Sequence, residues 1–477
     1  MILVSFLCFL VCFAVIGVLS FRQSKKNSKD YYLASQSVSP WLVGLSAVAT
    51  NNSGYMFIGV IGYTYTTGLA AIWLMVGWIV GDFVGSMYIH KQLHRATERT
   101  KALSFAGVIS SWQGGSMPKL QRILGLVAFI FLMAYASAQL VAGSKALNVL
   151  LGWPSYAGAV VGALIVVTYC MAGGIRASIW TDAAQSFVMV FSMAILLWVS
   201  VASLGGFDSA VAALRGIPGY LDKAPTDLVV PGIAGVVLFL LGWFFAGLSV
   251  IGQPHVMVRF MALDSGGKMR QARAWYYSWF VVFYFMATAV GLLSRVLLPD
   301  MANFDPELAL PTIALELLPA VLVGLILAGI FAATMSTADS LVLACSAVLT
   351  SDLSSGKPSL WVAKGATLIV SAGALLWALF SSQSVFSLVV MSWSIIASAF
   401  APLLILLAFK RSFGEAAGIA IVLTGVSVAI GWRMLGWQNY VYEGMPAIIL
   451  ALVLSPIYAL LLPQKGMKDD SPTSKSV

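Results

Sequence analysis

Residues 319–346 read PAVLVGLILAGIFAATMSTADSLVLACS, and this segment is the strongest indication of the fold class. It is longer than the roughly 20 apolar residues with which a helix crosses the hydrocarbon core of a bilayer. Its centre, AATMSTADS at 332–340, carries hydroxyl side chains and the acidic Asp339. An apolar segment of this length with polar residues at its middle predicts a transmembrane helix with a functional site.

Similar apolar segments recur from one end of the chain to the other. The 477 residues are 60% hydrophobic and 9% charged, whereas a soluble domain is roughly 25% charged, so a soluble globular fold is excluded. We expect an all-α polytopic membrane protein with about 13 transmembrane helices. It would form one domain over 1–463, followed by a disordered cytoplasmic tail over 464–477. The predicted spans are 2–21, 41–66, 69–90, 122–146, 155–175, 181–204, 230–252, 275–297, 319–346, 362–381, 385–408, 416–434 and 444–462.

The basic residues indicate the orientation. Most of the 27 Lys and Arg residues fall in loops on one side of the predicted bundle, and the other side receives Lys145, Arg215, Lys223, Arg295 and Arg433. Because cytoplasmic loops carry the excess of basic residues, we expect a multi-pass protein of the cytoplasmic membrane, with its N-terminus outside and its C-terminus cytoplasmic. The net charge of +9 then reflects topology. It indicates no nucleic-acid partner, and no obligate protein partner is evident; the bilayer and a small molecule are the expected partners.

Three acidic residues stand inside predicted spans: Asp82, Asp182 and Asp339. An ionisable group near the bilayer centre costs at least about 2.5 kcal/mol and is retained mostly where it meets a cavity, an ion or a partner. No basic residue is predicted at comparable depth, so a bound cation would be the counter-ion. The alternatives are a polar bond to a neighbouring helix for Asp82 and a helix-start acid for Asp182.

The neighbourhood of Asp339 favours sodium. Ala333, Ser336, Thr337 and Ser340 are spaced to share one face of a helix. A hard cation prefers oxygen ligands, which hydroxyls and free carbonyls supply without adding charge. A packing seam of small residues with back-bonded hydroxyls explains the same pattern equally well.

Two other spans look interrupted, at 46–54 (SAVATNNSG) and 252–255 (GQPH). The first is polar and helix-poor, and in the second Pro254 removes a helix donor. Unpaired backbone at membrane depth is tolerated where it lines a cavity. Paired broken helices indicate the substrate and ion sites of a secondary transporter.

Residues for catalysis are scarce. The chain has three His and four Cys, with no Walker sequence, no HExxH and no CxxC. We therefore expect no enzyme activity, no cofactor and no metal beyond sodium.

Several segments resemble the sodium:solute symporter family, most closely its sodium/proline symporter branch. They are KDYYLA at 29–34, LSA at 45–47, SG at 53–54, GGI at 173–175, WTD at 180–182, GQPH at 252–255, RFMA at 259–262, AATMST at 332–337, Trp393 and FAP at 400–402. The resemblance implies a LeuT-like fold of 5+5 inverted repeats, about 41–204 and 230–408, with one helix before and two after.

The same resemblance implies site residues. The main sodium site would comprise the carbonyls of Ala49, Asn52 and Ala333 and the hydroxyls of Ser336 and Thr337. A second cation site, present in some relatives, would fall on Asp182, Asp339 and Ser340, although family members often carry serine where this chain has Asp339.

Two departures concern the solute. Asn51 stands where the proline branch has an aspartate, and Ala246 and Val250 stand where it has a Trp and a Tyr, which predicts a wider, less aromatic pocket. The candidate pocket residues are Asn51, Ser53, Gly54, Gln253 and Trp393.

The sequence therefore predicts sodium-coupled symport of a small organic solute into the cell, either an amino acid such as proline or another small carboxylate. The coupling ion would be Na⁺. The alternatives are proton coupling through Asp339 or Asp182 and a membrane solute sensor without transport.

Overall fold

The computed structural model describes residues 1–154, 156–225, 228–298, 304–354, 356, 358–380 and 385–463, without the side chain of residue 386. The predicted tail, 464–477, lies outside them. Across the described ranges the regular elements are helices. The one β-type contact in these ranges is an isolated bridge between Val38 and Leu263. This agrees with the predicted class, because a helix satisfies its own backbone groups where water is absent.

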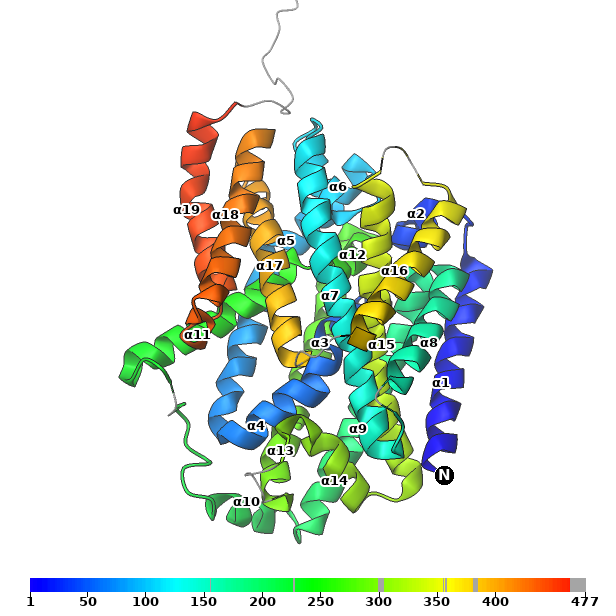
Figure 1. Cartoon of the computed structure of the whole chain (residues 1–477), viewed down its shortest axis with the longest axis vertical. Coiled ribbons are helices and arrows are strands. Elements are labelled where there is room, and N and C mark those ends of the chain that lie inside the picture. Colours follow the sequence, from blue (N-terminus) through cyan, green and yellow to red (C-terminus); the bar gives the residue numbers. More distant parts are fainter. Residues whose placement is uncertain are drawn as a thin grey trace, which may run out of the picture.

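The long helices run side by side as one bundle (Figure 1). The N-terminus and the last residues of α19 lie at opposite ends of it. The long helices are α1 (Ile2–Leu19), α3 (Pro40–Tyr55), α5 (Ile72–Thr100), α7 (Pro118–Leu151), α8 (Ala157–Gly173), α9 (Ile175–Ser203), α11 (Gly232–Leu248), α13 (Met269–Leu297), α15 (Ala320–Ser351), α16 (Leu360–Phe380), α17 (Val385–Ala408), α18 (Glu415–Met434) and α19 (Gly444–Leu461). Shorter helices are α2 (Ser28–Leu33), α4 (Ile61–Thr67), α6 (Phe105–Ser111), α10 (Phe207–Arg215), α12 (Pro254–Met261) and α14 (Ala309–Leu317).

The number of membrane-spanning helices agrees with the predicted count of about 13, once a long run is divided and a short apolar helix is included. Among the described residues, 11 helical runs are long and apolar enough to cross a membrane. One of these, Pro40–Thr100, contains two predicted spans separated at Gly68, whose φ is +78°. The apolar helix Ala157–Gly173 has 17 residues, one fewer than the shortest of these runs.

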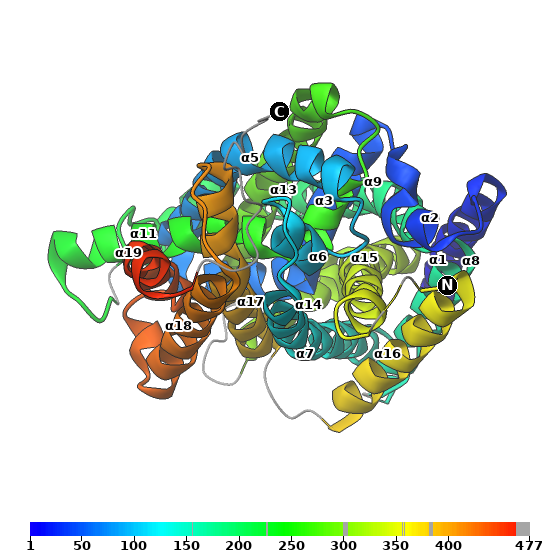
Figure 2. The ribbon, with the colours of Figure 1, turned by 90° about the horizontal axis from the view of Figure 1, so that it is seen from above.

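The centre of the bundle is α15, packed between α3, α7 and α9. Its segment 332–340 is buried throughout. Figure 2 shows α1, α16 and α19 at the rim, where α16 exposes Trp361 and Ile369. The apolar exterior and the buried polar centre are the arrangement expected of a bundle whose function lies inside the membrane.

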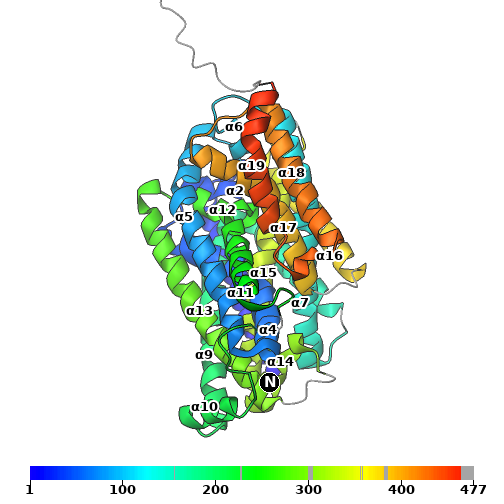
Figure 3. The same ribbon diagram turned by 90° about the vertical axis from the view of Figure 1, so that its left-hand side faces the viewer.

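Both predicted interruptions are present. In α3, Ser53 has φ 29° and ψ −178°, outside the helical region. In the seventh span, α11 ends through a short 3-10 turn, Ser249–Gly252, and Gln253 (φ −93°, ψ 105°) separates it from α12. Pro254 is the first residue of α12, where its missing N–H costs nothing. Figure 3 shows α11 and α12 in succession beside α5.

Glycines allow α5 and α11 to cross closely. A Cβ at Gly81 would lie 1.8 Å from the Phe244 carbonyl oxygen, and a Cβ at Gly247 would lie 1.9 Å from the carbonyl oxygen of Trp78. These distances are too short for any side chain. The crossing therefore needs both glycines, and it positions the neighbouring Trp78 and Asp82 in the interior.

Candidate ion and solute sites

The break in α3 redirects its backbone hydrogen bonds. In an unbroken helix the Gly54 N–H would donate to the Thr50 carbonyl. Here it donates to Gln139 Oε1 on α7, at 2.9 Å. The Thr50 carbonyl instead accepts a bond from Thr337 Oγ1 on α15, at 2.9 Å. The break thus turns backbone oxygen of α3 toward the polar face of α15.

Five oxygen atoms gather at this contact, all from buried residues. Ser336 Oγ donates at 3.1 Å to the Ala49 carbonyl and at 3.2 Å to the Ala333 carbonyl. Thr337 Oγ1 lies 3.2 Å from the same Ala333 oxygen. The structure therefore brings together four of the five predicted sodium ligands and adds a fifth oxygen, that of Thr50, which the prediction missed.

The fifth predicted ligand, Asn52, is not among these contacts. Its side chain donates to the Val48 carbonyl one turn earlier, at 2.7 Å. This side-chain hydrogen bond stays within α3, and no hydrogen bond in the described part of the chain joins the Asn52 carbonyl to α15.

The three residues of the predicted second cation site also lie together. Ser178 Oγ on α9 donates to Asp339 Oδ1 at 3.0 Å, and Ser46 Oγ on α3 donates to Asp182 Oδ2 at 2.6 Å. Ser340 Oγ donates to Asp339 Oδ1 at 2.8 Å. Every side chain of the cluster is buried.

A guanidinium group occupies the middle of this cluster. Arg259 on α12 is fully buried, with Nη2 3.3 Å from Asp182 Oδ2 and 3.7 Å from Asp339 Oδ1. The same nitrogen donates to Ser178 Oγ at 2.6 Å and also to Ser340 Oγ, and Nη1 donates to the His255 carbonyl at 2.7 Å.

The prediction that no basic residue reaches this depth is therefore wrong. Arg259 follows the seventh span in sequence, and the charge pattern places it in a cytoplasmic loop. Because the chain resumes as α12 after the break at Gln253, the side chain of Arg259 points into the protein interior. It is a counter-ion to two of the three acids that the sequence leaves unpaired.

A small cavity lies beside the α3 break. Its volume is about 10 Å³, less than a small solute needs. Three of the five predicted pocket residues, Asn51, Ser53 and Trp393, line it. The rest of the lining is Tyr55, Trp78, Tyr135, Trp243, Val389, Val390 and Tyr442.

Ala246 and Val250, from which a wider and less aromatic pocket is predicted, do not line this cavity, and most of its lining is aromatic. Ala246 and Val250 are buried behind the lining, and the Ala246 carbonyl accepts a bond from Trp393 Nε1 at 3.1 Å. The aromatic side chains come instead from other positions on α5, α7 and α11 and from the segment before α19. The sequence signal was available in part, since Trp78 lies between the glycines 77 and 81 of the close crossing.

The other two predicted pocket residues, Gln253 and Gly54, contact neighbouring helices outside the cavity lining. Gln253 Nε2 donates to the Trp393 carbonyl at 2.9 Å, which ties the α11–α12 break to α17. Gly54 lies against α7 and α15, where a Cβ would be 2.7 Å from the Thr334 methyl group. Neither residue lines the cavity.

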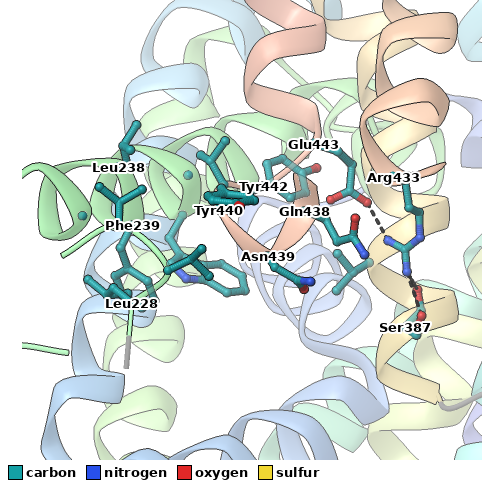
Figure 4. A pocket seen from close by; sticks show the side chains of 17 residues that line it. Leu228, Leu238, Phe239, Ser387, Arg433, Gln438, Asn439, Tyr440, Tyr442 and Glu443 are labelled. Carbon is teal, nitrogen blue, oxygen red and sulfur yellow. Dashed lines mark hydrogen bonds and ion pairs between the residues drawn. The ribbon is translucent and has the colours of Figure 1, made fainter. Parts of the chain in front are cut away.

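A second cavity, of about 350 Å³, adjoins the first and shares Trp243, Val390 and Tyr442 with it (Figure 4). Arg433 crosses its wall, with Nη1 2.7 Å from Glu443 Oε1 and Nη2 2.7 Å from Ser387 Oγ. The cavity lies where α11 and α17 begin and α18 ends. It has the size of an ordinary ligand pocket, and shared side chains separate it from the smaller one.

Comparison with known proteins adds three findings. A family model described as "Sodium:solute symporter family" matches residues 31–425. The high-affinity proline transporter PutP of Bacillus subtilis (strain 168) is 28% identical over 461 residues, covering 94% of this chain and 96% of that protein. The sodium/proline symporter of Escherichia coli (strain K12) is 27% identical, covering 96% of this chain and 93% of that protein.

Solved structures show the same fold. A Na⁺-coupled sialic acid symporter, solved in a substrate-bound outward-open state, superposes with a TM-score of 0.82 over 98% of this chain and 99% of that one, at 19% identity. MHP1, a nucleobase-cation-symport-1 family transporter in a closed conformation, gives a TM-score of 0.58 at 14% identity, over 91% of this chain and 95% of that one. At these identities the likeness concerns architecture, and it confirms the predicted fold class.

Proposed function

The chain belongs to the sodium:solute symporter family, and on that basis we propose that it carries proline, or a closely similar small amino acid, into the cell together with Na⁺. The observation that carries the proposal is the contact between the α3 break and the hydroxyl face of α15. Backbone carbonyls freed by a break, facing two hydroxyls, are the uncharged oxygen ligands that suit a hard monovalent cation.

The sodium ligands are the carbonyls of Ala49 and Ala333 and the hydroxyls of Ser336 and Thr337. The Asn52 carbonyl is left out of this set, because its residue is not part of the contact with α15. The Thr50 carbonyl is an additional ligand on the evidence of its bond to Thr337. Because the ligands come from both α3 and α15, bound Na⁺ holds the two helices together. The solute pocket lies at the same break, so the ion and the solute act on one structural element.

One Na⁺ accompanies each solute in this proposal. The second cluster of acids already contains the Arg259 guanidinium, at 3.3 Å from Asp182 and 3.7 Å from Asp339. A second cation there would meet like charge unless Arg259 moved away. Asp182, Asp339 and Ser340 therefore serve to hold α9, α12 and α15 together.

The small pocket has complementary groups for a zwitterion. Asn51 Oδ1 and Trp78 Nε1 are buried and have no hydrogen-bond partner among the described residues. The first accepts a bond from the ammonium group of the solute, and the second donates to its carboxylate. The surrounding aromatic rings supply apolar contact for a short hydrocarbon ring. The 350 Å³ cavity is the entrance, and Trp243 and Tyr442 must move aside for the solute to pass.

Uptake of radiolabelled proline into proteoliposomes tests this function. An inward Na⁺ gradient should drive accumulation, and a K⁺ gradient should not. Ser336→Ala removes one ligand and should raise the Na⁺ concentration for half-maximal uptake by about tenfold, the effect of about 1.4 kcal/mol. Ser371→Ala, which removes a hydroxyl bonded within α16, is the matched control.

Three results would count against the proposal. Uptake in Na⁺-free buffer driven by a pH gradient would indicate proton coupling. Proline binding without counterflow would indicate a sensor. A Ser336→Ala protein with unchanged Na⁺ dependence would overturn the ion-site assignment.

The orientation is part of the same proposal. The N-terminus lies outside and the C-terminal end lies in the cytoplasm, with two repeats, about 41–204 and 230–408, each opening with a broken helix. The basic loops support this orientation, and the breaks at Ser53 and Gln253 support the repeats.

A further inference from the structure

Asp82 is a buried acid that belongs neither to the sodium site nor to the Arg259 cluster. It lies in the interior of α5 beside the close crossing with α11, and its side chain is fully buried. Asp182 and Asp339 have Arg259, whereas Asp82 has no Lys, Arg or His within ion-pair distance in the described part of the chain. A lone carboxylate in such surroundings is expensive, and binding a proton removes that cost.

Hydrogen bonds link Asp82 to the solute pocket. Tyr276 on α13 donates from its hydroxyl to Asp82 Oδ2 at 2.7 Å. The same hydroxyl oxygen accepts a bond from Asn51 Nδ2 at 2.6 Å. Asn51 belongs to α3, two residues before the break, and lines the pocket. The series therefore runs from a buried acid through one hydroxyl to an amide in the pocket wall.

The direction of the bonds fixes the orientation of the amide. Because the Tyr276 proton points to Asp82, its oxygen can only accept, and Asn51 must offer its NH₂ group. The Asn51 carbonyl oxygen, Oδ1, is left without a partner among the described residues, as is Asp82 Oδ1. Ionised Asp82 thus sets Asn51 to present a hydrogen-bond acceptor to the pocket.

We propose that Asp82 is a proton-binding site that reverses this series of bonds and thereby changes the polarity of the solute pocket. When Asp82 takes up a proton, its O–H donates to the Tyr276 oxygen. The Tyr276 hydroxyl proton then turns to donate to Asn51 Oδ1, and the amide rotates so that its NH₂ group faces the pocket. One proton is gained at Asp82, and no covalent bond changes elsewhere.

The groups of α13 nearest Asp82 are tyrosines, and the charged Arg273 lies on the same helix one turn before Tyr277. Helix α13 faces it with Tyr276 and Tyr277, and Tyr284 lies two turns further on. The segments packed on α5 from α6, α11, α17 and the turns 68–71 and 249–252 contain no titratable residue. The turn Gly266–Lys268 also packs on α5, and its Lys268 pairs with Asp264 at 2.6 Å. On α12, His255 offers its carbonyl to Arg259, and Arg259 is bonded within the Asp182 cluster.

This inference rests on the proposed solute pocket and predicts a direction. A protonated amine needs an acceptor, which Asn51 presents when Asp82 is ionised. The KM for proline should therefore rise as the pH falls, by about tenfold, the effect of exchanging one charge-assisted hydrogen bond for a repulsive contact. Asp82 and Tyr276 are positioning residues, and Asn51 contacts the solute.

The test uses the full-length protein in proteoliposomes at saturating Na⁺, with the KM for radiolabelled proline measured from weakly acidic to weakly alkaline pH. Asp82→Asn cannot bind the proton. Tyr276→Phe interrupts the series of hydrogen bonds between Asp82 and Asn51 but keeps the acid. Both should give a KM that does not vary with pH, at unchanged Na⁺ dependence. Glu98→Gln removes a half-exposed carboxylate from the same helix and should keep the wild-type pH profile.

A second measurement does not need the solute. The pH-induced infrared difference spectrum of the purified protein should contain the C=O bands of buried carboxylic acids, and Asp82→Asn should lose one of these bands. The proposal would be overturned if Asp82→Asn kept the wild-type pH dependence of the KM for proline, or if its infrared difference spectrum were unchanged. Absence of Na⁺-driven proline uptake at every pH would instead overturn the proposed function, and the infrared band would still decide the proton site.

Discussion

Replacing Arg259 by glutamine should destabilise the protein strongly and make its stability depend on Na⁺. The guanidinium lies between two fully buried carboxylates, at 3.3 Å from Asp182 and 3.7 Å from Asp339. Removing it leaves both acids without a counter-ion. Breaking a buried ion pair in this way costs about 3–5 kcal/mol, most of it the penalty of the charge left behind.

The assay is thermal unfolding of the purified protein in detergent, in Na⁺ and in K⁺ buffer. We expect Arg259→Gln to unfold at a clearly lower temperature, and Na⁺ to restore part of the loss, because the vacated cluster of two carboxylates and two hydroxyls can then bind a cation. Adding Asp339→Asn to Arg259→Gln should also restore stability, since one buried charge is removed. Equal stability of wild type and Arg259→Gln, or no rescue by Asp339→Asn, would refute the assignment of Arg259 as the counter-ion.

Three further predictions concern the solute pocket, the α3 break and the end of α15. Trp78→Phe removes the indole N–H proposed to donate to the solute carboxylate. Uptake assays should show a KM for proline about tenfold higher, with Na⁺ dependence unchanged. An unchanged KM would mean that Trp78 does not bind the carboxylate. Gln139→Leu leaves the Gly54 N–H unsatisfied at the α3 break, and denaturation should show a loss of about 1–3 kcal/mol; a neutral effect would mean that another group satisfies this N–H. Burial raises the pKa of Asp352, at the end of α15, from its ordinary 3.8 to about 7, against the opposing hydrogen bonds of Ser104 and Gln121. The folded protein therefore holds a proton that the unfolded chain releases, and stability falls as the pH rises between these values. Asp352→Asn should flatten that part of the thermal midpoint profile, and an unaltered slope would contradict it.

Much of the architecture could be predicted, because the bilayer imposes simple rules on sequence. Each apolar segment of sufficient length became a helix. Pro254 and the polar run before Gly54 identified both breaks, since each weakens helix pairing where the flanking residues are strongly apolar. The oxygen face of α15 followed from the helical spacing of Ala333, Ser336 and Thr337, which needs no tertiary information.

The contents of the interior were harder to predict. Arg259 was assigned to a loop because the charge rule counts residues along the chain, whereas the side chain returns into the bundle on α12. The aromatic lining comes from helices far apart in sequence, so Trp78, Tyr135 and Trp243 carry no common local pattern. The contact between the Thr50 carbonyl and Thr337 was not predicted, because it depends on the geometry of the break at Ser53, which composition does not report.

In the proposed function, Na⁺ and the solute bind at one broken helix and therefore depend on each other. The most direct test is the thermal midpoint of the purified protein with and without proline, in Na⁺ and in K⁺ buffer. Proline at about 100 times its Kd should stabilise the protein by about 2.7 kcal/mol in Na⁺, and it should have little effect in K⁺. Equal stabilisation by proline in both buffers would contradict the coupling of Na⁺ and solute binding, because the pocket would then form without the ion.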